Sequence, residues 1–351
     1  MRLKYAKKIP CSFAIVQRFL IIRFSSIGDI VLTSPIVRCL AAKYPEAEIH
    51  YLSKPAFRGI LESNPHISKV WMWNEDSKEL INELRSMQFD YIIDLHHNLR
   101  SFLVKSKLNR KSASFNKLNI EKYLYVNFRI GKLPDVHIVD RYFATLEKLG
   151  VVNDKQGLDF FIQEKDSVKI NDLLPDTHHT GYIAVVIGAL KATKRLPHDK
   201  LSELCDKIQF PLVLLGGELE KNEGALLSEK LGPRVLNMCG ELTLGQSASL
   251  VKQAMLVVTH DTGLMHIAAA FQKPIVSIWG NTIPEFGMYP YMPSAESKQF
   301  IAEVKELPCR PCSKIGYGTC PKKHFRCMQN QDLEKIAEEV RRLLQPAHPG
   351  D

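Results

Sequence analysis

The stretch Val257-Val-Thr-His-Asp-Thr-Gly-Leu-Met-His-Ile-Ala-Ala-Ala270 decides the fold of this chain. The apolar run that leads into it predicts a buried strand over residues 255–259, and the residues that follow predict a helix over 262–271. The polar turn Asp261-Thr-Gly263 lies between the two. A strand that passes through a short polar turn into a helix is the repeating unit of a parallel α/β sheet. Because the amides and the dipole at the start of such a helix attract anions, the turn also predicts a seat for a diphosphate.

The same strand-and-helix unit repeats along the chain in two series. Apolar runs predict four strands in the first series, at 19–24, 47–52, 69–73 and 91–95, and four in the second, at 182–187, 211–215, 255–259 and 274–279. A helix is predicted after the first strand, continuing through Leu40. Further helices are predicted at 138–149, 196–208, 218–231, 243–253, 262–271 and 332–344. The expected fold class is therefore α/β, with two Rossmann-like, doubly wound parallel-sheet domains that face a central cleft.

The two series set the predicted domain limits. The first Rossmann-like domain covers residues 19–155, and the second covers 181–329 with a Cys-rich loop at 309–327. A polar stretch without a clear period, 156–180, is the predicted linker, and 330–345 is a C-terminal helix. Residues 1–18 carry five Lys or Arg and no acid. They are predicted to be a disordered basic tail, an extension upstream of the physiological start, or a segment that touches a membrane.

The net charge restricts the partners without choosing one. The chain of 351 residues has a net charge of +9, from 47 Lys and Arg against 38 Asp and Glu. A basic excess suits nucleic acid, an anionic membrane surface or a phosphorylated substrate, and it is also typical of a solvated surface. No helix-turn-helix, RNA-recognition motif or basic-aromatic repeat is found, which argues against nucleic acid. No apolar run reaches the ~18 residues that span a bilayer and no signal-peptide core is found, so a cytoplasmic location is expected.

Polar residues follow the first strand in the turn Arg23-Phe-Ser-Ser-Ile-Gly-Asp29. Ligands bind beyond the carboxyl ends of the strands in open α/β sheets, so these side chains are expected at the cleft. Asp29 has two interpretations, an acid that the helix dipole favours at a helix start and a general base presented at the sheet edge. Ser25, Ser26 and Gly28 offer hydroxyls and amides to an acceptor or a phosphate. The three-glycine spacing of a dinucleotide fingerprint is missing, which argues against an epimerase or a dehydrogenase.

Further polar positions follow strands of the second series. Lys194 lies among cations ahead of a helix, which predicts either an anion site or a solvated basic loop. Glu218, like Glu220, suits a ribose hydroxyl as well as the first turn of a helix. Asp261 can cap its helix, contact a ligand, or do both. His266 on that helix can be a packed histidine or part of the site.

Four of the eight cysteines crowd into the segment Cys309-x2-Cys312-x7-Cys320-x6-Cys327. The spacing is similar to that of a small metal knuckle, and a cytosolic compartment favours a metal over disulfides. A structural Zn²⁺ on these four thiols is one interpretation, and packed free thiols or an incidental disulfide are the other. Neither interpretation gives the cluster a catalytic role.

Taken in order, these segments resemble glycosyltransferase family 9, which contains the ADP-heptose:lipopolysaccharide heptosyltransferases. The most specific matches are Asp261-Thr-Gly-Leu-Met-His266 with Ala268–Ala270, and Ser25-Ser-Ile-Gly-Asp-Ile-Val-Leu-Thr-Ser-Pro35. Thr193-Lys-Arg-Leu-Pro197, Leu215-Gly-Gly-Glu218 and the Cys309-Arg-Pro-Cys312 region match less specifically. The resemblance covers residues 17–345.

The resemblance implies the GT-B fold and an inverting transfer of heptose from ADP-heptose to a lipopolysaccharide inner-core acceptor, or of another nucleotide sugar to a different surface glycan. The first domain would bind the acceptor, and the second would bind the nucleotide sugar. Asp29 would be the general base, with a pKa that desolvation in the cleft raises toward the working range. The resemblance implies donor contacts by Lys194 to phosphate, Glu218 to ribose, Leu242 to the base, and by Asp261, Thr262, Gly263 and His266.

No cofactor is expected, because no Asp-x-Asp triplet offers Mg²⁺ a pair of carboxylates. Two positions depart from the family's pattern: Ala189-Leu190 stand where hydroxyl residues are frequent, and Leu196 stands where Trp is usual. These departures predict differences in the fine donor contacts and not in the class of enzyme.

The basic stretch 100–132 predicts the contact with the acceptor. It holds nine Lys or Arg and a single acid, Glu121, and an inner-core glycolipid carries phosphates and carboxylates. The same cations would bring the enzyme into peripheral contact with the cytoplasmic face of the inner membrane. The predicted acceptor contacts are Ser25, Ser26, Gly28, Arg100, Lys105, Lys107, Arg110 and Lys111.

Overall fold

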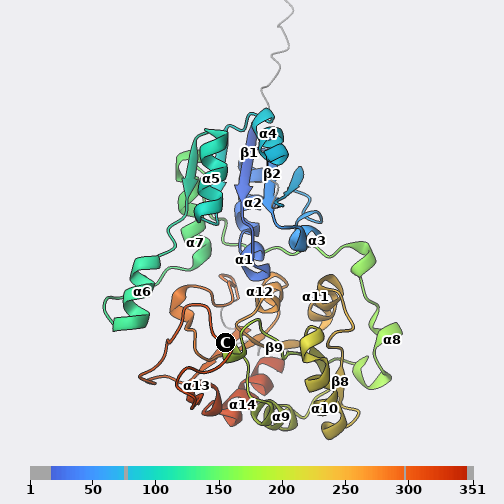
Figure 1. The fold of residues 1–351 in the computed structure, drawn as a ribbon. Coiled ribbons are helices and arrows are strands. Elements are labelled where there is room, and N and C mark those ends of the chain that lie inside the picture. Colours follow the sequence, from blue (N-terminus) through green and yellow to red (C-terminus); the bar gives the residue numbers. More distant parts are fainter. Residues whose placement is uncertain (1–16, 75–77, 296–297, 346–351) are drawn as a thin grey trace, which may run out of the picture.

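The computed structural model describes residues 17–74, 78–295 and 298–345, and it contains two lobes that each hold one parallel sheet (Figure 1). The first sheet has the strand order β3-β2-β1-β4-β5, and the second has the order β11-β10-β9-β6-β7-β8. Each neighbouring pair of strands is parallel. The expected class of two parallel α/β domains is confirmed. The predicted basic tail, up to residue 16, lies outside the described residues.

The first sheet is built around β1 (Arg18–Ile22), which has apolar side chains on both faces of the sheet. Phe19, Leu20, Ile21 and Ile22 are at most 2% exposed. Burying one such side chain contributes roughly 1.5–3 kcal/mol, so this run favours the central place in the sheet. The other strands of this sheet are β2 (Glu48–Ser53), β3 (Lys69–Met72), β4 (Tyr91–Asp94) and β5 (Ser112–Ser114).

The prediction of one continuous helix after the first strand is wrong, because the structure has two helices there, α1 (Ile27–Val31) and α2 (Ser34–Lys43). Pro35 lies in the first turn of α2. Proline lacks an N–H and is favoured at a helix start, so it ends one helix and begins the next. The remaining helices of this lobe are α3 (Arg58–Leu61), α4 (Lys78–Ser86), α5 (Leu99–Leu108), α6 (Asn119–Phe128) and α7 (Ile138–Phe143).

The second lobe is built around β9 (Leu256–His260) and β6 (Ile183–Val186), whose residues are buried throughout. Residues 151–182 join the lobes through short helical turns that include α8 (Ile170–Leu173). The other strands are β7 (Leu212–Leu215), β8 (Val235–Asn237), β10 (Ile275–Trp279) and β11 (Gln299–Glu303). The helices are α9 (His198–Lys207), α10 (Lys221–Leu231), α11 (Leu244–Gln253), α12 (Gly263–Ala270), α13 (Arg326–Gln329) and α14 (Leu333–Leu344).

The lobes meet where α1 packs against α12, at the centre of Figure 1. Two glycines allow the close approach. A Cβ on Gly28 would lie 2.5 Å from Cδ2 of His266, and a Cβ on Gly263 would lie 2.7 Å from Cγ2 of Ile27. One apolar cluster continues through this contact from the first lobe into the second. The contact brings the residues after β1 next to the residues after β9.

Candidate active site

Asp29 lies in α1 and is held by side chains of its own turn. Its Oδ1 forms an ion pair with Nη2 of Arg23 at 2.5 Å, and its Oδ2 accepts hydrogen bonds from the Ser26 hydroxyl at 2.7 Å and the Ser26 amide at 3.1 Å. Arg23 is anchored in turn, because its Nη1 donates to the Leu95 carbonyl at 2.5 Å and to the Tyr142 hydroxyl at 3.1 Å. The carboxylate therefore has a fixed orientation at the carboxyl edge of the first sheet.

The pKa of Asp29 is lowered, which overturns the expectation that the cleft would raise it. Burial alone would raise the pKa, but the positive charge of Arg23 and the hydrogen bonds from Ser26 outweigh burial. The expectation was wrong because it considered desolvation without the arginine six residues earlier in the chain. At neutral pH Asp29 is therefore an ionised carboxylate.

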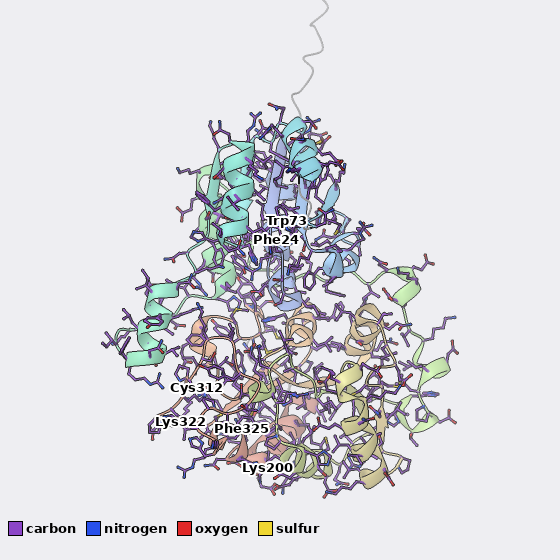
Figure 2. All side chains as sticks on the ribbon, viewed as in Figure 1. Phe24, Trp73, Lys200, Cys312, Lys322 and Phe325 are labelled. Carbon is purple, nitrogen blue, oxygen red and sulfur yellow. The ribbon has the colours of Figure 1, made fainter. Side chains whose placement is uncertain are left out.

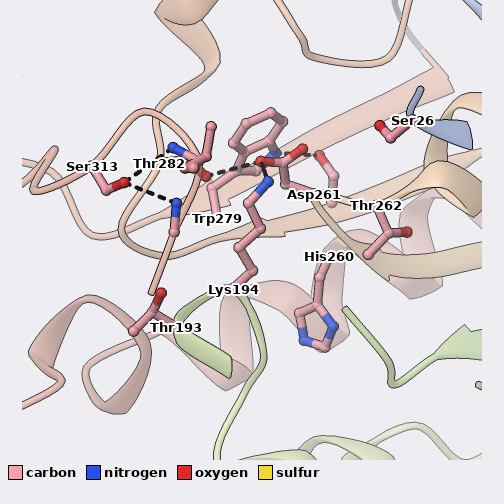
Figure 3. A network of polar contacts seen from close by, with 12 residues as sticks. Ser26, Thr193, Lys194, His260, Asp261, Thr262, Trp279, Thr282 and Ser313 are labelled. Atoms are coloured by element: carbon pink, nitrogen blue, oxygen red, sulfur yellow. Dashed lines mark hydrogen bonds and ion pairs between the residues drawn. The ribbon is translucent and has the colours of Figure 1, made fainter. Parts of the chain in front are cut away.

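Lys194 and Asp261 face each other across the ends of two segments of the second lobe (Figure 3). Nζ of Lys194 lies 2.6 Å from Oδ2 of Asp261, and the hydroxyl of Thr282 donates to the same oxygen at 3.0 Å. The side chains of Lys194 and Asp261 are 17% and 12% exposed, so the pair is largely shielded from water. The structure thus brings together the two predicted donor residues, with Thr282 as a third member that the sequence analysis did not identify.

Thr262 and Gly263 form the start of α12, as the sequence predicted. Thr262 is the N-cap residue, and the first amides of a helix have no partner within the helix. His266, on the same helix, is 2% exposed and packs against Gly28 of the other lobe. Burial lowers the pKa of His266 to about 4, so its imidazole is neutral at the lobe contact. This environment favours the interpretation of a packed histidine that joins the lobes.

Glu218 and Glu220 occupy different environments although both follow β7. Glu220 is buried and forms an ion pair with Arg195 at 2.7 Å, and it also accepts a hydrogen bond from the Gly217 amide at 2.9 Å. Glu218 is exposed. Of the two, Glu218 is therefore the acid that is free to bind a ribose hydroxyl. Leu242 lines a cavity between the linker and the second lobe, together with residues 167–169, 172–173, 238, 241 and 246.

The turn after β1 holds three residues that were predicted to contact the acceptor substrate, Ser25, Ser26 and Gly28. Ser26 donates its hydroxyl to Asp29 and so supports the base. The Ser25 carbonyl accepts a hydrogen bond from Nε of Arg23 at 2.7 Å. Gly28 lies against His266, where the lobes leave no room for a side chain. These three residues therefore shape the surroundings of Asp29 in the structure.

The cations predicted to bind the acceptor are only partly at the cleft. Lys105 forms an ion pair with the buried Asp94 at 2.9 Å, which makes it part of the fold of that loop. Arg100 stacks on Phe24 and Trp73, two neighbouring rings of the first lobe that Figure 2 labels. The structure explains both side chains without a ligand.

Lys107, Arg110 and Lys111 lie at the opposite edge of the sheet from Asp29. The Lys111 carbonyl pairs with the amide of Ile92 at the start of β4, whereas Asp29 follows the end of β1. Parallel strands place starts and ends at opposite edges, so the structure does not bring these three cations to the cleft. The prediction that these three cations lie at the cleft was wrong because α5 begins near the cleft and ends at the opposite edge of the sheet.

Four other cations lie near the lobe contact, and the predicted contacts did not include them: Lys117 and Lys122 are close enough to Asp29 to feel its charge, and Arg141 and Lys314 act in turn on Lys122. Lys122 is 9% and Arg141 8% exposed, and both donate to the Phe286 carbonyl of the second lobe, at 3.0 and 2.9 Å. Among the residues that the structure describes, neither these two nor Lys117 and Lys314 form an ion pair. We call Lys117, Lys122, Arg141 and Lys314 the cleft cations.

Burial and the neighbouring charges of Arg141 and Lys314 lower the pKa of Lys122 to about 7. The pKa of Lys117 is lowered too, by burial and by Arg23. Positive charge has therefore gathered near the lobe contact without an ion-pair partner among the described residues, which is the arrangement expected of a site that receives an anion. The signal for Lys117 and Lys122 was present in the basic stretch 100–132, but Arg141 and Lys314 are separated from it in sequence.

The four clustered cysteines come together around a small cavity of the second lobe, and Figure 2 labels Cys312 there. All four are free thiols, and Sγ of Cys309 lies 3.7 Å from Nε2 of His324. Burial and the neighbouring thiols together raise the pKa of Cys327 to about 12. Within residues 17–74, 78–295 and 298–345, no group of three or more His, Cys, Asp or Glu has a geometry that holds a metal ion. The predicted Zn²⁺ thus gains no geometric support.

Known proteins are similar to this chain in sequence and in fold. A sequence model described as glycosyltransferase family 9 (heptosyltransferase) matches residues 78–317. Lipopolysaccharide heptosyltransferase 1 of Campylobacter coli is 26% identical over 289 residues, which cover 76% of this chain and 84% of that protein. The glycosyl transferase family 9 structure from Veillonella parvula aligns with a TM-score of 0.75 at 21% identity, over 93% of this chain and 97% of that one. The structure of E. coli ADP-heptose lps heptosyltransferase II aligns with a TM-score of 0.70 at 22% identity, over 93% and 98%.

The two parallel-sheet lobes have the GT-B fold of these structures, and the match to the family model makes the chain a glycosyltransferase. The family model covers well over half of the sequence, and the chain belongs to glycosyltransferase family 9. The predictions of the family, the fold and the class of enzyme are confirmed.

Proposed function

We propose that this enzyme transfers heptose from ADP-heptose to the inner core of a lipopolysaccharide acceptor, with inversion at the anomeric carbon and without a metal ion. One observation carries the proposal. Asp29, an ionised carboxylate of one lobe, meets the anion-binding start of α12 of the other lobe across the contact of Gly28 with His266. The names of the related proteins, lipopolysaccharide heptosyltransferase 1 and ADP-heptose lps heptosyltransferase II, supply the donor and the acceptor.

The donor diphosphate is proposed to lie at the start of α12. The amides of Thr262 and Gly263 and the helix dipole attract negative charge, and Lys194 adds a cation beside them. Asp261 holds Lys194 in place and can hydrogen-bond sugar hydroxyls. Glu218 would bind the ribose and Leu242 would pack on the base. The second lobe is thus the nucleotide-sugar domain of this proposal.

In the proposed reaction, the acceptor hydroxyl oxygen attacks the anomeric carbon of heptose while its proton passes to Asp29. The bond from the anomeric carbon to the donor's phosphate oxygen breaks, and ADP leaves with that bond's electron pair. Attack opposite to the leaving group inverts the anomeric centre. Negative charge develops on the departing diphosphate, and preorganised donors at such a position are worth roughly 3–4 kcal/mol each. Lys194 and the α12 amides supply this stabilisation, which a divalent cation supplies in other transferases.

The cleft cations are proposed to bind the anionic groups of the acceptor. Three of them, Lys117, Lys122 and Arg141, belong to the first lobe, as Asp29 does, and none of the four has a carboxylate partner among the described residues. The carboxylates and phosphates of an inner-core glycolipid would provide that partner through charge-assisted hydrogen bonds. This proposal replaces Lys107, Arg110 and Lys111 as acceptor contacts.

We further propose that the enzyme works in the cytoplasm as a peripheral protein at the inner membrane, where a glycolipid acceptor would be found. In the described part of the chain, no helix is both long and apolar enough to cross a bilayer. Contact with the membrane would then depend on surface side chains, for which the basic stretch 100–132 is suited.

The proposal is tested by incubating the purified protein with ADP-heptose and a lipid A–core acceptor, with EDTA present, and by following ADP release. Matched reactions contain UDP- and GDP-sugars. We expect ADP release that requires the acceptor and persists in EDTA. Release only with another nucleotide sugar would replace the donor, loss of release in EDTA would contradict metal independence, and no release with any donor would overturn the transfer itself.

A further inference from the structure

The helix α6 has its polar and apolar sides in unusual places. Lys122 points inward and is 9% exposed, whereas Ile120, Tyr123 and Phe128 are 73%, 59% and 57% exposed. Surface helices normally turn apolar residues inward and lysines outward. Figure 1 shows α6 projecting from the body of the molecule at the left, so the apolar side chains stand on a protruding element.

Exposed apolar side chains are concentrated in this part of the first lobe. Half of the large hydrophobic residues that are exposed in the described structure, eight of 16, lie between residues 99 and 136. Scattered exposed apolar residues are ordinary, but such a concentration marks an interaction surface. The eight are Leu99, Phe102 and Leu103 of α5, Ile120, Tyr123 and Phe128 of α6, and Ile130 and Val136.

The charge of the same segment indicates what covers it. Lys117, Arg129 and Lys132 flank α6 in the sequence, against one acid within the helix, Glu121. Large apolar side chains beside an excess of cations are typical of elements that lie in the interface of an anionic membrane. A neutral apolar partner would not require this charge. Bacterial phospholipids with phosphate headgroups satisfy both the apolar and the cationic features.

We propose that the outer face of α6, formed by Ile120, Tyr123, Phe128 and the following Ile130, inserts into the headgroup region of an anionic lipid bilayer. The inward side of the same helix carries Lys122, which is close enough to Asp29 to feel its charge. An α-helix is only about 10 Å across, so one helix connects the membrane surface with the reaction centre. The advantage of this arrangement rests on the proposed glycolipid acceptor, whose sugar can reach Asp29 while its acyl chains stay in the bilayer.

The first test is co-sedimentation with two kinds of vesicle, phosphatidylcholine alone and equal parts of phosphatidylethanolamine and phosphatidylglycerol. We expect the full chain to bind the phosphatidylglycerol vesicles and to bind phosphatidylcholine far more weakly. The double variant Ile120→Ser/Tyr123→Ser should lose on the order of tenfold in partitioning, since it removes two inserted apolar side chains. The matched control is Val152→Ser/Leu226→Ser, which removes two exposed apolar side chains elsewhere, at 78% and 56% exposure, and should bind as the parent does.

A second measurement places the helix directly. In the variant Tyr123→Trp, addition of phosphatidylglycerol vesicles should shift the added fluorescence to shorter wavelength, and phosphatidylcholine vesicles should not. The vesicles contain no acceptor, so the result does not depend on the transfer reaction. Activity of Ile120→Ser/Tyr123→Ser on a delipidated core oligosaccharide should equal that of the parent, which also shows that the variant is folded.

Three results would overturn the proposal. Equal sedimentation of the double variant and the parent would show that α6 is not the inserted element. No binding to phosphatidylglycerol vesicles, with normal transfer to the oligosaccharide, would show that the enzyme acts without this membrane contact. A parent that is dimeric by light scattering and becomes monomeric in the double variant would show that a second copy of the chain covers α6.

Discussion

The donor side and the acceptor side of the cleft differ in whether their cations have a carboxylate partner. On the donor side, Lys194 is paired with Asp261 at 2.6 Å, and Thr282 supports the same carboxylate. On the acceptor side, Lys122 and Arg141 are buried, and both donate to a backbone carbonyl, that of Phe286, rather than to a carboxylate. The donor side is thus neutral and ordered before a ligand arrives, and the acceptor side carries unbalanced charge.

This difference has a physical consequence for each ligand. A diphosphate approaches a lysine that already has a partner, so the helix start of α12 must provide part of the attraction. An anionic acceptor approaches Lys117 and Lys122, whose pKa values burial has already lowered, and its binding restores their charge. The donor site therefore depends on geometry, and the acceptor site depends on protonation.

The largest effect is expected for Asp29→Asn, which removes the proposed proton acceptor. Asp29 belongs to neither the donor side nor the acceptor side of the cleft. We expect kcat to fall by roughly 10²–10⁴, the usual contribution of a positioned base. The affinity for ADP should stay at the parent's value, as measured by calorimetry. Because Arg23 loses its ionic partner, thermal unfolding serves as the control for the fold. A kcat within a factor of a few of the parent's would exclude Asp29 as the base.

Lys194→Met sharpens the donor side of the comparison. The substitution removes a cation beside the leaving diphosphate and leaves Asp261 without its ionic partner, so kcat/KM for the donor should fall by roughly 10²–10³. The double variant Lys194→Met/Asp261→Asn should recover part of the loss, because the uncompensated carboxylate no longer repels the diphosphate. Steady-state kinetics of both variants measure this. A double variant that is as poor as the sum of its parts would argue against the repulsion.

Lys122→Met sharpens the acceptor side. The variant keeps the length of the side chain and removes its charge, and we expect the acceptor KM to rise about tenfold with donor KM unchanged. Lys107→Met and Arg110→Met, at the far edge of the sheet, are the matched controls and should leave the acceptor KM unaltered. If the far-edge variants raised the acceptor KM and Lys122→Met did not, the acceptor would bind where the basic stretch alone had suggested.

The pH dependence is the mildest expected effect. Burial and its cationic neighbours lower the pKa of Lys122 from 10.5 to about 7 in the folded protein, so the lysine is charged below pH 7 and loses its proton above it. The acceptor KM should rise by up to tenfold per pH unit above about pH 7, and Lys122→Met should flatten that profile. Between about pH 7 and 10.5 the unfolded chain binds the extra proton, so this group makes the free energy of unfolding rise with pH there. A parent profile that matches the variant's would remove Lys122 from acceptor binding.

The sequence predicted the buried central strands well and missed three of the four edge strands. The run at 255–259 is observed as Leu256–His260, and the run at 19–24 as Arg18–Ile22. The strands β5, β8 and β11 were not predicted, and all three stand at sheet edges. Edge strands bury less surface, so a segment such as Ser112–Ser114 needs no apolar run to pair with its neighbour.

Site residues that directly follow a strand could be predicted from the sequence. Site residues that depend on contacts between distant parts of the chain could not. The residues after β1 and β9, including Asp29 and Asp261, could be identified because parallel sheets place ligands at those positions. Arg141 and Lys314 could not, because neither follows a strand and because Lys314 belongs to the other lobe. The direction of the Asp29 pKa was missed for the same kind of reason, since it depends on the orientation of Arg23.

The separation of the two sides is tested most directly by calorimetric titration of ADP into three proteins, the parent, Lys194→Met and Lys122→Met, without an acceptor. The account predicts that Lys194→Met binds ADP more weakly than the parent and that Lys122→Met binds it as the parent does. A loss of ADP affinity in Lys122→Met as large as that in Lys194→Met would contradict the account, because the cleft cations would then belong to the donor.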